Sequence, residues 1–274
     1  MPEGPEIRRA ADRIAAALVD RTATDIFFAF EHLQPFREIL VGATVTAIET
    51  RGKALLTRFD KPYSIYSHNQ LYGVWYVRAP GTLPDTKRQL RLAIHNRNKS
   101  ALLYSASDIE VLHDSELPYH PFLSRIGPDA LDSKVTPEEI AERLTEKAFM
   151  RRRLAGLLLD QGFVSGLGNY LRSEILFVSR LHPQQRPIDL SDTDRDRLAR
   201  AILDVTRQSY ATGGITNDPA IAASLKAEGW KRWQYRHWVF SRAGEPCFVC
   251  GTRIEKSAIA GRRAYICPKC QPLR

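Results

Sequence analysis

The first six residues, Met1-Pro2-Glu3-Gly4-Pro5-Glu6, place a possible nucleophile beside an acid. Methionine ahead of proline is normally excised, which leaves Pro2 with a secondary amine whose pKa lies far below that of a lysine ammonium. An unprotonated amine attacks a carbon electrophile, and the adjacent Glu3 could transfer protons during that reaction. The same residues also occur where prolines and glutamates simply begin a helix. The pair predicts covalent amine chemistry, which other motifs must support.

All four cysteines form two Cys-x2-Cys pairs, Cys247/Cys250 and Cys267/Cys270, with 16 residues between the pairs. This spacing predicts one tetrahedral zinc ion with four thiolate ligands. Disulfide bonds are the alternative, but the chain shows neither a secretory apolar segment nor any other cysteine. Four protein ligands leave no position open for a substrate, so we expect a structural zinc.

Two turns in the first half of the chain carry further candidates. Arg51-Gly52-Lys53 joins two predicted strands, so Lys53 projects from a hairpin, where a lysine is usually a solvated edge charge. The segment 67–73 is a polar loop with Gln70, Leu71 and Tyr72 at its tip. Leu71 and Tyr72 belong either to the core or to an apolar wedge of the kind that unstacks bases in a duplex.

The motif Gly166-Leu167-Gly168-Asn169 interrupts a helical region with two glycines and an amide. A helix that begins there presents free backbone N–H groups to an anion such as phosphate. Glycines also serve a purely steric role where two helices meet in a tight turn. The motif alone supports both interpretations.

The charge distribution indicates a polyanionic partner. The formal net charge is +9, and residues 226–274 contain 11 Lys and Arg against 3 Glu and no Asp. A chain that is basic mainly at one end is typical of proteins that bind nucleic acid there, although a merely basic protein is the alternative. No apolar run approaches the length of a membrane span, so we expect no membrane partner.

The elements that must position these residues begin with a helix that Pro5 opens. Short segments rich in β-branched and aromatic residues then predict strands; they lie at 24–30, 44–50, 54–59, 64–67, 74–77, 89–95 and 100–104. This pattern favours a β-sandwich or barrel-like domain over residues 1–112. A proline-punctuated linker is predicted over 113–135.

Helix signals follow over residues 136–212, with helices expected at about 137–147, 152–160, 169–178 and 192–211. Residues 213–237 are expected to be a loop. Within it and just beyond, residues 230–238 interleave aromatic and basic side chains, which suits nucleic-acid contact or an amphipathic element that folds onto the tail. Strands at 238–240, 252–255 and 263–266 would complete a β-hairpin zinc finger over 238–274.

In this order the motifs resemble the Fpg/Nei family of DNA glycosylases, and the resemblance covers essentially the whole chain. It includes Pro2-Glu3 at the start, Lys53 on a hairpin, the Gly-Leu-Gly-Asn helix start and the four-cysteine finger, with Arg262 five residues before Cys267. Within the family, the opening Pro-Glu-Gly-Pro-Glu-Ile and the contiguous 70–72 loop are most similar to the endonuclease VIII branch.

The resemblance implies an α+β multidomain fold with an N-terminal β-sandwich and helix, a helix-two-turn-helix domain and a C-terminal β-hairpin zinc finger. It implies a base-excision-repair enzyme, both DNA glycosylase and AP lyase, that removes oxidised pyrimidines from double-stranded DNA and also acts at abasic sites. The expected cofactor is one structural Zn²⁺, and a bacterial cytoplasmic monomer is expected, bound to nucleoid DNA. The alternatives are an oxidised-purine glycosylase, acting on formamidopyrimidine or 8-oxoguanine, and a non-catalytic DNA-binding zinc protein.

The resemblance also implies roles for single residues. Pro2 would attack C1′ and form an iminium, and Glu3 would protonate the sugar ring oxygen. Lys53 and Arg262 would assist β- and then δ-elimination, with Glu6 supporting the geometry of the site. The residues implied in DNA binding are Gly168, Asn169 and Arg125 at backbone phosphates and Gln70, Leu71 and Tyr72 in the gap left by the extruded base. The region from Gly213 to Trp238 is longer than the family norm, so lesion contacts there are unassigned.

Overall fold

The computed structural model describes residues 2–273, which form two compact units. The first contains Pro2 and residues 6–125, and the second contains residues 3–5 and residues 126–273. Helix α1, Gly4–Leu18, therefore has its first residues in the second unit and the rest in the first.

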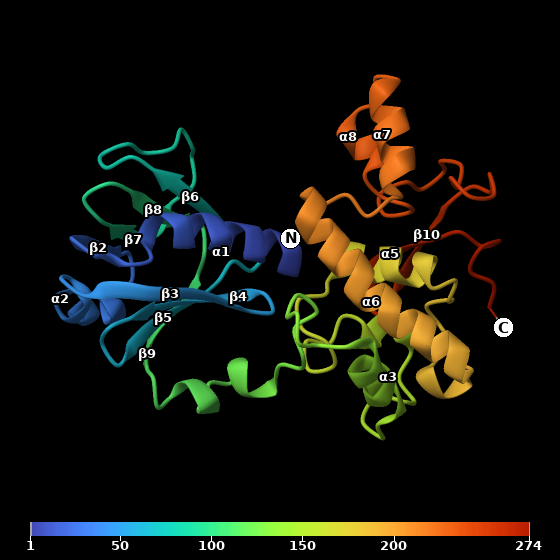
Figure 1. Cartoon of the computed structure of the whole chain (residues 1–274), viewed down its shortest axis with the longest axis horizontal. Helices are drawn as coiled ribbons and strands as arrows, with labels where there is room; N and C mark the ends of the chain where they lie inside the picture. Colours follow the sequence, from blue (N-terminus) through green and yellow to red (C-terminus); the bar gives the residue numbers. More distant parts are fainter. Residues whose placement is uncertain (1, 274) are drawn as a thin grey trace. The chain divides into compact units, whose positions relative to one another are not determined.

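The first unit is a sandwich of two antiparallel sheets (Figure 1). One sheet has the order β1-β3-β4-β5-β9, and the other β2-β7-β8-β6. The strands are β1 Arg21–Thr22, β2 Asp25–Phe28, β3 Thr44–Arg51, β4 Ala54–Phe59, β5 Tyr63–His68, β6 Val74–Arg78, β7 Leu90–His95, β8 Ser100–Tyr104 and β9 Asp108–His113, with η1 Glu31–Leu33 and α2 Pro35–Leu40 between β2 and β3.

The core of this unit lies between the sheets and receives one face of α1. Ala10, Ile14 and Leu18 follow the helical period and pack with residues of both sheets, such as Ile26 and Leu55. The predicted β-sandwich with a helix is confirmed. The sequence analysis missed strand β9, in which buried Ile109 and Val111 alternate with more exposed neighbours.

The segment after β9 contains two short 3-10 helices, η2 Leu117–Tyr119 and η3 Leu123–Arg125. Leu117, Phe122 and Leu123 pack on the outer face of the first sheet against Leu56 and Tyr66. The first half of the segment predicted as a linker is therefore folded onto the β-unit.

The second unit is mainly helical. Its helices are α3 Pro137–Thr145, α4 Leu154–Leu157, α5 Asn169–Val178, η4 Pro187–Asp189, α6 Asp192–Thr212, α7 Pro219–Ala227 and α8 Arg232–Tyr235. The side chains of Thr136 and Ser191 cap α3 and α6, since Thr136 accepts from the Glu139 N–H at 3.3 Å and Ser191 from the Asp194 N–H at 3.1 Å. Helix α5 is the buried centre of this unit.

Two predictions of secondary structure in this unit need correction, one of a helix and one of a loop. The helix expected over 152–160 is limited to the four residues of α4. The loop predicted over 213–237 is also wrong, because α7 and α8 form there and project from the other helices of the unit (Figure 1). Asp218 accepts hydrogen bonds from the N–H groups of Ala220 and Ile221, and Pro219 occupies the first helical position. The Asn-Asp-Pro sequence is thus a helix start.

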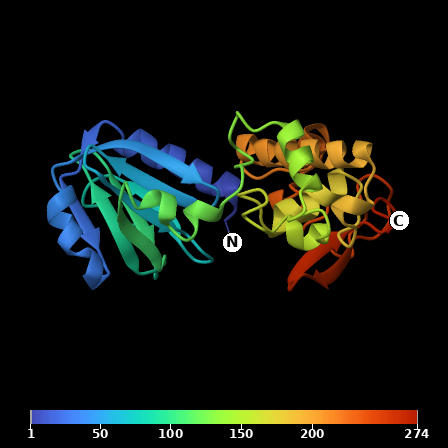
Figure 2. The same ribbon diagram turned by 90° about the horizontal axis from the view of Figure 1, so that it is seen from below.

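The C-terminal region forms one hairpin from β10, Glu255–Ile259, and β11, Arg262–Ile266, visible as the red arrows of Figure 2. The strand expected at 238–240 is absent, and that expected at 252–255 contributes only Glu255. Residues 238–240 instead direct their N–H groups to the carboxylate of Glu174. None of the helices within residues 2–273 combines the length and the apolar composition that crossing a bilayer requires.

Candidate active site

The carboxylate of Glu3 lies at the N-terminus of α5. Its Oε1 accepts a hydrogen bond from the Tyr170 N–H at 2.9 Å, and its Oε2 accepts one from the Leu171 N–H at 3.2 Å. Glu3 is 2% exposed. The first N–H groups of a helix have no partner inside the helix, and the helix dipole favours a negative charge there. The anion site predicted at this helix start is therefore occupied by a carboxylate of the chain itself, that of Glu3.

The two glycines of the Gly-Leu-Gly-Asn motif make this arrangement possible. Gly166 has a φ of +90°, and its carbonyl accepts from the Gly4 N–H at 2.8 Å. A Cβ on Gly168 would lie 2.4 Å from the carboxyl carbon of Glu3 and 2.5 Å from its Oε1. The two glycines thus make room for the segment Glu3-Gly4, and the phosphate contact of Gly168 stays a prediction.

A buried arginine, which the sequence analysis did not single out, links α5 to the hairpin. Arg172 is fully buried and donates to the Asn169 Oδ1 at 2.9 Å, to the Arg263 carbonyl at 2.8 Å and to the Ile259 carbonyl at 3.3 Å. Burial and then the nearby Arg262 lower the pKa of Arg172 to about 10, while Glu3 opposes them. Arg172 therefore fixes both strands of the hairpin next to the turn that carries Arg262.

The hairpin presents Arg262 as the sequence analysis predicted. Ala260 and Gly261 have φ values of +54° and +70°, which is the two-residue turn that matches the twist of a hairpin. Arg262 pairs with Ile259 across this turn, and its side chain is exposed. Arg262 therefore lies next to the tip of the hairpin.

Lys53 lies in the first unit, in the turn between β3 and β4, with Gly52 before it at a φ of +60°. It is only 8% exposed, so it is not a solvated edge charge. Burial is the main reason that the pKa of His68 is lowered; Asp108 raises this pKa and Lys53 lowers it. Lys53, in the turn before β4, therefore lies near His68 of β5, which in turn lies near Asp108 of β9.

The loop between β5 and β6 carries the predicted wedge. Leu71 is 52% and Tyr72 is 64% exposed, which excludes both from the core. Of the other candidates in this unit, Pro2 and Glu6 are half-buried and Arg125 is exposed at the end of η3. Met1 lies outside the described residues, so its removal stays a prediction.

A second buried carboxylate organises the segment around α7 and α8. Glu174 of α5 is fully buried and accepts hydrogen bonds from the Thr216 hydroxyl and from the N–H groups of Trp238, Val239 and Phe240, the last three at 2.7, 2.9 and 2.9 Å. Burial raises the pKa of Glu174, and these donors oppose the shift. One side chain thus holds both ends of the segment 217–237.

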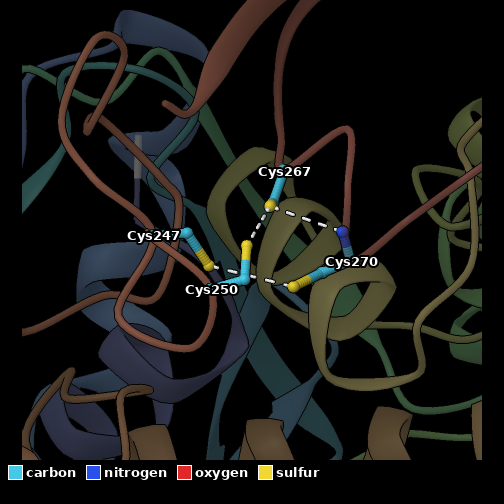
Figure 3. Close-up of side chains that lie close together, drawn as sticks. All are labelled: Cys247, Cys250, Cys267 and Cys270. Atoms are coloured by element: carbon cyan, nitrogen blue, oxygen red, sulfur yellow. Dashed lines mark hydrogen bonds between the residues drawn. The ribbon is translucent and has the colours of Figure 1, made fainter. Parts of the chain in front are cut away.

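The four cysteines converge as predicted (Figure 3). Their Sγ atoms all lie within 4.8 Å of one another, with 3.9 Å between Cys247 and Cys270 and 3.4 Å between Cys250 and Cys267. Zinc–thiolate bonds of about 2.3 Å at tetrahedral angles require sulfur separations of about 3.8 Å, whereas a disulfide requires about 2.05 Å. The donor set therefore fits a zinc ion and does not fit disulfides.

Three family models match regions of the chain. Residues 1–107 match the formamidopyrimidine-DNA glycosylase N-terminal domain, residues 126–219 the formamidopyrimidine-DNA glycosylase H2TH domain, and residues 244–273 the zinc finger found in FPG and IleRS. Endonuclease 8 of Salmonella arizonae is 51% identical over 271 residues, which cover 99% of this chain and 100% of the relative. The chain belongs to the Fpg/Nei family of DNA glycosylases. Endonuclease 8 of Escherichia coli K12 is 49% identical to this Fpg/Nei enzyme over the same length. The predicted family, enzyme class and structural zinc are thereby confirmed.

Solved structures confirm the fold of this Fpg/Nei enzyme. Lactococcus lactis formamidopyrimidine DNA glycosylase, bound to DNA with an AP site, matches 99% of this chain and 100% of its own, with a TM-score of 0.81 at 23% identity. The same enzyme with DNA containing N7-benzyl-Fapy-dG gives a TM-score of 0.82 at 22% identity. This likeness supports the fold alone, and the roles of single residues remain predictions.

Proposed function

We propose that this Fpg/Nei enzyme removes damaged bases from double-stranded DNA with the Pro2 amine as nucleophile and then cleaves the strand. The observation that carries the proposal is the position of the Glu3 carboxylate. Glu3 follows Pro2 directly in the chain, and N–H groups at the N-terminus of α5 bind its carboxylate. Binding alone has no use for a buried carboxylate beside an N-terminal secondary amine. This distinguishes the enzyme from a DNA-binding zinc protein without catalysis.

The Pro2 nitrogen attacks C1′ of the damaged nucleotide and the base leaves with the electron pair of the glycosidic bond. Glu3 accepts the proton that the nitrogen loses and delivers it to the sugar ring oxygen, so that the ring opens to an iminium.

The iminium is an electron sink that acidifies the C2′ protons, so β-elimination breaks the 3′ phosphate bond and δ-elimination then breaks the 5′ phosphate bond. Lys53 and Arg262 are proposed as the proton donors and phosphate partners of these two steps, and Glu6 as a residue that supports the start of α1. Asn169 and Arg125 are proposed to bind backbone phosphate. Asn169 suits this role because its Oδ1 is already engaged by Arg172, which leaves its amide hydrogens to donate.

The proposed substrates are oxidised pyrimidines. Gln70, Leu71 and Tyr72 lie on one contiguous loop, and the exposed Leu71 and Tyr72 can stack in the space that an extruded base leaves. An oxidised pyrimidine has lost planarity or pairing, so its extrusion costs less than the roughly few kcal/mol of a normal base. We also propose that the enzyme acts as a monomer in the bacterial cytoplasm, which size-exclusion chromatography coupled to light scattering would check.

Borohydride trapping tests the chemistry. Wild-type protein incubated with abasic or damaged DNA and borohydride should become covalently attached to DNA, whereas Pro2→Gly should not. Glu3→Gln should lose base release but retain DNA binding, because the residue acts on the reaction rather than on affinity. Normal turnover by Glu3→Gln would show that the assignment is wrong. Faster release of 8-oxoguanine opposite cytosine than of thymine glycol would contradict the pyrimidine preference.

A further inference from the structure

The loop that carries Gln70 is closed by its own backbone. The Gly73 N–H donates to the Asn69 carbonyl at 2.7 Å, and the Asn69 side-chain amide donates to the Gly73 carbonyl at 3.1 Å. A Cβ on Gly73 would lie 2.6 Å from that carbonyl oxygen, so the closure requires glycine. The loop base is therefore rigid.

Within this loop Gln70 has a strained backbone. Its φ is +48°, a region that residues with a Cβ rarely adopt, and its N–H donates to the His68 Nδ1 at 3.0 Å. Such a conformation persists only where the surroundings fix it, and it is concentrated at functional sites. Leu71 and Tyr72 beside it extend into solvent, but Gln70 is held.

The side chain of Gln70 is held by the turn between β8 and β9. The Ser107 hydroxyl donates to the Gln70 Oε1 at 2.7 Å. The Gln70 amide also lies near the Asp108 carboxylate, whose pKa burial raises and the amide lowers. An ionised carboxylate only accepts hydrogen bonds, so the amide nitrogen must face Asp108 and the amide oxygen must face Ser107. A flipped amide would place its oxygen against the carboxylate.

This arrangement uses only half of the hydrogen-bonding capacity of the amide. The oxygen retains one lone pair and the nitrogen retains one hydrogen, both available to a base on the opposite strand. A freely rotating amide could serve any base by exchanging the two. A fixed amide presents its donor and its acceptor in fixed places, which suits some base edges better than others.

We propose that Ser107 and Asp108 are positioning residues that fix the Gln70 amide in one orientation and thereby set which base is preferred opposite the damaged nucleotide. This inference rests on the proposed placement of Gln70 in the gap of the duplex. Neither residue contacts the reacting atoms in this role. They affect only the preference for the base opposite the damaged nucleotide.

The experiment measures single-turnover cleavage at a natural abasic site placed opposite adenine, cytosine, guanine or thymine. A fifth duplex carries a tetrahydrofuran residue, which has no base, at the opposite position. Each rate is divided by the rate of the same enzyme on the fifth duplex, so that general effects on chemistry cancel. The abasic substrate makes the result independent of which damaged bases are excised.

The wild-type rates should differ by about fivefold between the best and the worst of the four opposite bases, the value of roughly one hydrogen bond. Ser107→Ala and Asp108→Asn should reduce this difference to less than about twofold, and Ser107→Thr, which keeps the hydroxyl, should restore it. A flat wild-type profile, or variants that keep the wild-type profile, would overturn the inference. So would a Ser107→Thr profile that remains as flat as that of Ser107→Ala.

Gln70→Ala, measured in parallel, separates this inference from the function on which it rests. If Gln70→Ala also flattens the profile while Ser107→Ala and Asp108→Asn do not, Gln70 reads the opposite base without help from the β8–β9 turn, and the inference alone fails. If Gln70→Ala changes nothing, the proposed placement of Gln70 fails as well. In either case Pro2 trapping is unaffected and reports on the chemistry separately.

Discussion

Gly168→Ala should slow the reaction strongly, although Gly168 has no side chain that could take part in it. The added Cβ would lie 2.4 Å from the Glu3 carboxyl carbon, 2.5 Å from Oε1 and 2.7 Å from Cγ. Ordinary contact begins near 3.4 Å, so the carboxylate must move by about 1 Å, and misplacement by about 1 Å costs on the order of 100-fold in rate. We therefore expect kcat/KM to fall about 100-fold, equivalent to about 2.7 kcal/mol of transition-state stabilisation.

The assay is single-turnover cleavage of an abasic duplex, with zinc content and Tm measured on the same preparations. Gly156→Ala is the matched control, since its Cβ would meet only the Ala260 Cβ at 3.8 Å. Gly168 has a φ of −145°, which alanine adopts freely, so the effect is a clash and not backbone strain. In a Glu3→Gln background, Gly168→Ala should add little further loss, because both changes act on one group. Full activity of Gly168→Ala would refute the placement of Glu3 against α5.

Further expected outcomes concern a zinc ligand, two phosphate ligands and a buried histidine. Cys250→Ser should lose zinc by elemental analysis and weaken DNA binding, since the hairpin is too small to fold unaided; a variant that retains zinc would contradict this. Arg125→Ala should reduce the slope of log affinity against log salt by about 1, because a cation on phosphate releases counterions, whereas neutral Asn169→Ala should weaken binding and leave the slope unchanged. Burial lowers the pKa of His237 from 6.5 to about 3, so only the unfolded chain binds this proton between these values. His237 therefore does not reduce the free energy of unfolding above pH 6.5, but below it that free energy falls by up to about 1.4 kcal/mol per pH unit. Urea titrations in which wild type and His237→Gln show the same dependence on pH would refute this prediction.

The parts of the candidate site that depend on residues close together in the chain could be predicted from the sequence. Helix α5 begins at Asn169 as predicted, because the glycines before it are a local signal. The cysteine pairs and the hairpin tip at Arg262 were likewise local. The function of Gly168 was less accessible. The motif around Gly168 indicated a phosphate site. Only the fold shows that the carboxylate of Glu3, near the N-terminus of the chain, occupies it.

The features that were missed depend on long-range partners. Arg172 looks like an ordinary cation on a helix, and its acceptors at Ile259 and Arg263 are 87 and 91 residues away in sequence. The role of Glu174 could not be predicted for the same reason, because it accepts hydrogen bonds from residues that lie 64 to 66 positions later in the chain. The helix start at Asp218-Pro219 is a local signal, but Gly213-Gly214 just before it is an equally local signal for a loop.

Glu174 accepts hydrogen bonds from both Thr216 and Trp238, and this affects how the length of the chain between these two residues can vary. Because its two ends are pinned to one side chain, segment 217–237 is thermodynamically a closed loop. The entropy of closing a loop grows only logarithmically, by roughly 0.6 kcal/mol for each doubling of length. Exchanging α7 and α8 for a shorter or longer insert should thus change the entropy of closing this loop very little. For protein engineering, this is the place in the chain at which a reporter peptide or a new recognition element can be inserted.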